Sequence, residues 1–199
     1  MGQLMGTGGS DHSLVSLRET FSEEGVCLVS KENLVLATDQ WVTLNYKAEH
    51  LFYQKKTDKK STPHSFSSAP IKEGQKMGGA EAIIFDVVTS LQIQRLVRDI
   101  LAFPHFKVQQ CECHIFEEGD FISLEWMKQF IKDAPYLLTF GLNSPYQGGE
   151  HVFHQKKNAK KRYQPKSEDI LLSSCAFSHE ILPIIGGKKR TVLASINPL

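Results

Sequence analysis

The stretch from Gly148 to Arg190 organises this sequence. It reads GGEHVF at 148–153, YQP at 163–165, DILL at 169–172 and SHEILP at 178–183, and it continues into KRTVL at 189–193. These short runs are separated by Gly, Pro, Asn and Asp, which is typical of antiparallel strands rather than helices. His179 and Arg190 fall on two successive predicted strands, so we expect both side chains to lie in one pocket.

The order of residues within this stretch is specific. His179, Glu180 and Pro183 form a His-Glu-x-x-Pro motif, and Arg190 follows about ten residues after the His. This arrangement resembles the C-terminal half of the double-stranded β-helix in the 2-oxoglutarate and Fe(II)-dependent oxygenases, closest to the prolyl 4-hydroxylase-like branch. The resemblance implies that His179 stands at the distal iron-binding position. It also implies that Arg190 binds the far carboxylate of 2-oxoglutarate, although the turn at 186–189 has one or two extra residues.

The resemblance extends upstream but breaks where the metal is expected. Residues 116–122 (FEEGDFI) resemble the segment that leads to the family's first metal motif, His-x-Asp, and residues 137–143 (LLTFGLN) resemble the strand after it. In this register Glu125 takes the place of the His and Met127 takes the place of the Asp. Two of the three expected iron ligands are therefore replaced, within a resemblance that covers residues 108–196.

The replaced residues have alternative roles. Glu125 could supply a carboxylate ligand suited to Fe(II), or it could form an ion pair with a basic group. The candidate partners for that ion pair are Arg190, Lys128 and His179. Met127 is a poor ligand for Fe(II), and we expect it to fill the space left by the metal and the carboxylate.

Three further side chains bear on the site. His151 and His154 are near enough in sequence to serve as substitute ligands, but we expect both to face solvent. The planar guanidinium of Arg190 suits a bidentate carboxylate clamp, and strand alternation groups it with Val192 and Ala194. That set is apolar, which predicts that Arg190 points inward.

Two functions are compatible with this pattern. The first is an oxygenase-like protein with a degenerate metal site, which shows weak or no iron-dependent hydroxylation and has a binding or regulatory role. The alternative is an active non-haem iron oxygenase that hydroxylates an unknown substrate through His179 and Glu125. Both Fe(II) and 2-oxoglutarate are implied as cofactors by resemblance alone, and the loss of ligands weakens the case for each.

Composition sets the remaining bounds. The chain has 199 residues, of which 41% are hydrophobic and 23% are charged, and this predicts one globular domain over residues 11–199 after a disordered segment at 1–10. The net charge of +1 does not favour a nucleic-acid partner. No apolar run approaches a membrane span, so we expect a cytoplasmic protein with an unknown substrate or protein partner.

The predicted fold class is α+β, mainly β: a jelly roll at 108–196 with an N-terminal helical layer at 11–107. Helices are predicted at 13–21, ending near Gly25, at 37–55 and at 81–103, with a strand at 26–29. Residues 56–79 are predicted to form a long loop, and everything from Val108 onward is predicted to form strands.

Overall fold

The protein is built around a six-stranded antiparallel sheet. The computed structural model describes residues 14–33, 36–54, 67–71, 79–142, 146–155 and 159–199. In spatial order the sheet contains β1 (Val26–Val29), β8 (Ile170–Ser174), β4 (Tyr136–Gly141), β11 (Lys189–Pro198), β3 (Phe106–Phe116) and β2 (Ser67–Ile71). Strands far apart in the sequence are neighbours, as in the central pairing of β11 with both β3 and β4.

A smaller layer faces one side of this sheet. It contains a three-stranded sheet of β7 (Lys160–Tyr163), β6 (His151–His154) and β9 (Ser178–Ile181), and a pair formed by β5 (Tyr146–Gly148) and β10 (Ile184–Gly187). Every pairing is antiparallel. The predicted fold class, a jelly roll with an N-terminal helical layer, is confirmed.

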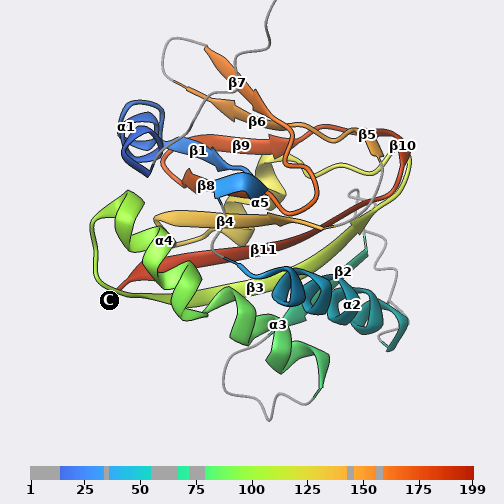
Figure 1. Cartoon of the computed structure of the whole chain (residues 1–199). Coiled ribbons are helices and arrows are strands. Elements are labelled where there is room, and N and C mark those ends of the chain that lie inside the picture. Colours follow the sequence, from blue (N-terminus) through green and yellow to red (C-terminus); the bar gives the residue numbers. More distant parts are fainter. Residues whose placement is uncertain (1–13, 34–35, 55–66, 72–78, 143–145, 156–158) are drawn as a thin grey trace, which may run out of the picture.

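Helices cover the opposite side of the six-stranded sheet. Figure 1 shows α2 (Thr38–Gln54), α3 (Ala80–Val88) and α4 (Leu91–Leu101) on that side, with β6, β7 and β9 on the other. The chain enters through α1 (Leu14–Glu24) and passes a short 3-10 helix, η1 (Lys31–Asn33), before α2. No helix within the described ranges is both long and apolar enough to cross a membrane.

Gly25 ends α1 as the sequence predicts. Its φ is +67°, and its N–H donates to the carbonyl of Phe21 at 2.7 Å. A Cβ at this position would lie 2.2 Å from the ring of Phe177. Both the left-handed conformation and the close contact therefore require glycine between α1 and β1.

Two predicted elements differ from the structure in the N-terminal half. The predicted helix at 81–103 is divided into α3 and α4, because Thr89 ends the first and Ser90 precedes the second. The Thr89 hydroxyl donates to the carbonyl of Phe85 at 2.8 Å, a local bond that competes with helix continuation. The predicted loop at 56–79 contains β2, which pairs with β3; most of that loop and the segment at 1–10 lie outside the described residues.

The prediction of strands alone after Val108 is also wrong. Residues Leu124–Phe130 form a helix, α5, in which the Ser123 hydroxyl caps the N–H of Trp126 at 3.3 Å. The helix buries Met127 and Phe130 and leaves Glu125 exposed. Since positions i and i+2 of a helix point in different directions, Glu125 and Met127 cannot both face one site.

Strand alternation divides the core into two layers. Val192, Ala194 and Ile196 on β11 pack in the layer between the six-stranded sheet and the helices. Leu193 packs in the layer between the two sheets, with Met127 and other buried residues: Phe116, Ile122, Phe130, Ile131, Leu137, Ile181 and Ile184. The odd-numbered residues of β11, which begin with Lys189, therefore face the space between the sheets.

Candidate functional site

Two histidines meet on neighbouring strands of the smaller layer. β6 pairs with β9 so that Phe153 lies opposite His179 and His151 lies opposite Ile181. His151 is fully buried and His179 is 3% exposed. The two rings have centroids 5.0 Å apart, with His151 Nδ1 at 2.9 Å from His179 Nε2.

Lys189 joins this pair from the six-stranded sheet. The side chain is only 2% exposed, and its Nζ lies 2.9 Å from His151 Nε2. The ammonium also donates to the carbonyl of Gly149 at 2.7 Å. The rings of Phe116 and Tyr146 flank it, with centroids 5.8 Å and 5.5 Å from Nζ, which suits a cation.

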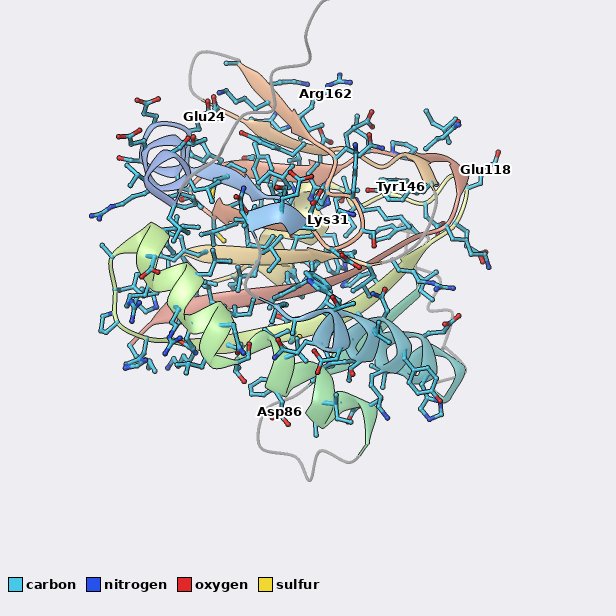
Figure 2. All side chains as sticks on the ribbon, in the orientation of Figure 1. Glu24, Lys31, Asp86, Glu118, Tyr146 and Arg162 are labelled. Carbon is cyan, nitrogen blue, oxygen red and sulfur yellow. The ribbon has the colours of Figure 1, made fainter. Side chains whose placement is uncertain are left out.

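A tight glycine turn brings the backbone to Lys189. Gly149 has φ of +67°, and a Cβ there would lie 2.4 Å from Ile184 Cδ1 and 3.3 Å from Lys189 Cδ. A side chain at this position would displace the turn and its carbonyl from the ammonium. Tyr146 (labelled in Figure 2) is the first residue of β5, and its hydroxyl donates to the carbonyl of Pro165.

Burial lowers the pKa of all three side chains in the cluster of His151, His179 and Lys189. Burial and then the nearby Lys189 ammonium lower the pKa of His179 to about 3, and the same two causes hold the pKa of His151 well below its usual value. Burial lowers the pKa of Lys189 to about 7, against the opposing effect of the Glu150 carboxylate. Near neutral pH both imidazoles are therefore uncharged, and Lys189 is the one member of the cluster whose charge changes in this pH range.

The structure places the predicted site residues in different environments. His179 lies in the cluster. Arg190 lies on the other face of β11, where Nη2 contacts Glu49 Oε1 on α2 at 3.1 Å. The apolar set that includes Arg190 does point inward, but toward the helical layer and away from His179.

Glu125 and Met127 do not join the cluster as ligands. Glu125 is exposed on α5, and within the described part of the chain it has no ion pair with Arg190, Lys128 or His179. Met127 is fully buried in the core between the sheets, and the idea that it fills the space of a metal and its carboxylate stays a prediction. The four positions 125, 127, 179 and 190 therefore do not converge on one cavity.

Lys189 was not among the predicted site residues, and His151 was named as a possible ligand but expected to be exposed. His151 is buried, contrary to the prediction that it faces solvent, whereas His154 is partly exposed and pairs with Glu180 at 2.8 Å. The HVFH pattern on β6 does not separate His151 from His154, because His151 shares a face with buried Phe153 and His154 shares the other face with buried Val152. Lys189 alternates with Thr191 and Leu193, which also face the space between the sheets, but the residues of the other face of β11 are equally buried, so the sequence carries no signal that selects Lys189.

Solved structures share this arrangement of layers. An oxidoreductase of the 2OG-Fe(II) oxygenase family from Burkholderia pseudomallei matches with a TM-score of 0.71 at 14% identity, over 94% of this chain and 91% of that one. The fold is that of the 2-oxoglutarate and Fe(II)-dependent oxygenases. A prolyl-4-hydroxylase from Pseudomonas putida gives a TM-score of 0.65 at 15% identity, over 94% of this chain and all of that one.

The oxygenase fold occurs in enzymes with other activities too. A non-haem α-ketoglutarate-dependent epimerase of nogalamycin biosynthesis, SnoN, matches with a TM-score of 0.70 at 12% identity, over 93% of this chain and 82% of that one. No protein-family model matches the sequence. No curated protein matches it either. At sequence identities of 12–15% the similarity establishes the fold, whereas the chemistry depends on the side chains at the site.

The donor atoms do not fit the iron centre that the oxygenase fold implies. Two His and one carboxylate on a shared face are the expected set. Within the described residues, no group of three His, Cys, Asp or Glu side chains could hold a metal ion. His151 and His179 hydrogen-bond to each other, and the nearest cation to them is Lys189.

Proposed function

We propose that this protein uses the oxygenase fold to bind a small carboxylate of the 2-oxo acid class at Lys189. Its role is that of a binding or regulatory module in the cytoplasm rather than of an iron-dependent hydroxylase. The observation that carries the proposal is a buried lysine that forms no ion pair within the described part of the chain.

The energetics of burial support an anionic ligand. An ammonium removed from water is costly unless an opposite charge or hydrogen-bond acceptors replace the lost hydration. Lys189 has two neutral acceptors, the Gly149 carbonyl and His151 Nε2. An ammonium has three protons, so one is left for a carboxylate oxygen, which would also supply the missing negative charge.

The choice of carboxylate comes from the comparisons. Several matched structures carry 2-oxoglutarate or α-ketoglutarate in their descriptions, and these share the strand layers that hold Lys189. We therefore take 2-oxoglutarate as the first ligand to test, with succinate as its analogue without the oxo group. The second function considered from the sequence, hydroxylation through His179 and Glu125, receives no support from the exposed position of Glu125.

Calorimetry of the whole chain tests the proposal. The protein is titrated with 2-oxoglutarate and with succinate in the presence of a chelator, and the titrations are repeated with Lys189→Met. Lys188→Met is the matched control, because it removes the same charge from a neighbouring side chain that is 58% exposed and pairs with Glu117.

We expect the wild type and Lys188→Met to bind and Lys189→Met to lose at least about tenfold in affinity, as expected for a hydrogen bond to a charged group. Equal affinity of all three proteins, or no binding by the wild type, would contradict the proposal. Release of succinate that depends on added Fe(II) and on His179 would favour the active oxygenase instead.

A further inference from the structure

We propose that Lys189, His151 and His179 form a hydrogen-bonded relay that prevents His179 Nε2 from binding a metal ion. We call this effect the closure of His179. Lys189 is the positioning residue on which this closure depends. The inference concerns the same cluster as the proposed carboxylate site but does not require that a carboxylate binds there. It follows from the distances within the cluster and from the donor and acceptor capacity of each group.

The first step concerns the charged form of Lys189. An ammonium only donates hydrogen bonds, so His151 Nε2 at 2.9 Å has to accept. A neutral imidazole that accepts at Nε2 carries its proton at Nδ1. His151 Nδ1 therefore donates to His179 Nε2 at 2.9 Å and occupies its lone pair.

The second step concerns the neutral amine. An uncharged lysine can accept, so His151 can carry its proton at Nε2 and donate to Nζ. His151 Nδ1 then accepts, and the proton between the two rings belongs to His179 Nε2. With the neutral amine, a proton is bound to His179 Nε2. With the ammonium, His179 Nε2 accepts a hydrogen bond from His151 Nδ1. In both arrangements a proton lies between the two rings, so the lone pair of His179 Nε2 is either protonated or engaged in a hydrogen bond and does not reach a metal.

Packing keeps the rings in place. Phe153 stacks on His179 with ring centroids 4.2 Å apart and an interplanar angle of 18°. Phe153 and His151 are both fully buried, and His179 is 3% exposed. Rotation of the His179 ring away from His151 would have to displace these contacts, so the relay is held by packing as well as by hydrogen bonds.

The distance between the two nitrogens makes the closure testable. Two nitrogens that each lie about 2.1 Å from a metal, at right angles to one another, are separated by about 3 Å. His151 Nδ1 and His179 Nε2 are 2.9 Å apart. The pair therefore has the spacing of two adjacent metal ligands, and a shared proton occupies the space between them.

Nuclear magnetic resonance of the wild type tests the relay directly. With ¹⁵N-labelled histidine and no carboxylate or metal present, we expect a scalar coupling across the hydrogen bond between His151 Nδ1 and His179 Nε2. The two histidines are assigned by comparison with His151→Gln and His179→Gln. If the coupling is absent in the wild type, the relay does not exist.

Cobalt titration tests the dependence on Lys189. Without the lysine, no ammonium holds the His151 proton at Nδ1. His151 can then carry its proton at Nε2 while His179 carries its proton at Nδ1, which leaves both facing nitrogens available to Co(II). We expect Lys189→Met to bind Co(II) at least about tenfold more tightly than the wild type and Lys188→Met do, the size of effect found when groups around a metal site change. The gain should vanish in Lys189→Met/His179→Gln.

Each result has a definite meaning. Tight Co(II) binding by the wild type through His179 overturns the closure. A wild-type coupling with no gain in Lys189→Met overturns the role of Lys189. Because no carboxylate is used, these outcomes are independent of whether 2-oxoglutarate binds, and the wild-type spectrum decides the relay even if Lys189→Met fails to fold.

Discussion

Lys189 and Arg190 are consecutive residues on β11, and their side chains lie on opposite faces of the six-stranded sheet. Lys189 reaches His151 between the sheets, whereas Arg190 reaches Glu49 on the helical layer. A shift of one residue along β11 would therefore exchange the two positions: the buried lysine at the candidate site and the partly exposed arginine whose ion pair joins α2 to the sheet.

Arg190→Gln should leave the candidate site intact. The side chain of Arg190 is 26% exposed and that of Glu49 is 39% exposed, so solvent screens the pair. We expect a loss of at most about 1 kcal/mol in the free energy of unfolding, measured with urea, and unchanged affinity for 2-oxoglutarate. A tenfold loss of affinity would mean that Arg190 serves the ligand after all.

Carboxylate binding should weaken as the pH rises. Only the ammonium form of Lys189 offers a full positive charge, and burial lowers its pKa to about 7. We therefore expect the dissociation constant for 2-oxoglutarate to be lowest below pH 7 and to increase as the pH rises through about 7. Calorimetry between pH 6 and pH 9 measures this dissociation constant. A constant affinity across the interval would contradict the proposal that Lys189 binds the carboxylate.

The histidines should make the fold sensitive to acid. The pKa of His179 is lowered to about 3 in the folded protein, whereas an unfolded histidine titrates near pH 6.5. The unfolded state therefore binds more protons between these values, and stability is lost as the pH falls from about 6.5 toward 3. His179→Gln should flatten this part of the curve of unfolding free energy against pH.

Restoring the metal motif by substitution should fail. Glu125→His/Met127→Asp places the expected residue types in the sequence, but positions 125 and 127 face different sides of α5. The Asp would replace a fully buried methionine without a partner, which we expect to destabilise the protein by about 3 kcal/mol or more. Co(II) binding that requires both introduced residues would show that α5 is not a helix in solution.

The elements with strong local signals could be predicted from the sequence. Gly25 marks the end of α1, and α2 matches the predicted helix at 37–55 within a residue or so at each end. The strands of the C-terminal half follow from short β-rich runs bounded by turn residues, and the fold class follows from their number and order. In these segments local preference and tertiary packing agree.

α5 lies where the resemblance to the oxygenases implies a strand. Glu125 and Met127 were predicted to lie on a strand, although Ser123 is a good N-cap and Met127 and Phe130 have helical spacing. A seven-residue helix carries too little periodicity to outweigh that resemblance. Its stability comes from the burial of Met127 and Phe130 between the sheets, which is a tertiary effect.

Of the candidate site, the sequence predicts the position of His179 but not that of Lys189. The His179 position follows from a motif, but the choice between Lys189 and Arg190 depends on which face of β11 points to which layer. Both faces are buried, so hydrophobicity alone does not distinguish them. Only the pairing of β11 with β3 and β4 settles which of the two basic residues meets His151.

The cation at this site is covalently attached to the polypeptide. A chelator cannot remove Lys189, and dioxygen cannot change its oxidation state as it can for ferrous iron. We therefore expect the fold and its ligand affinity to be the same in iron-starved and iron-replete conditions, a constancy that a metal-dependent relative would not have.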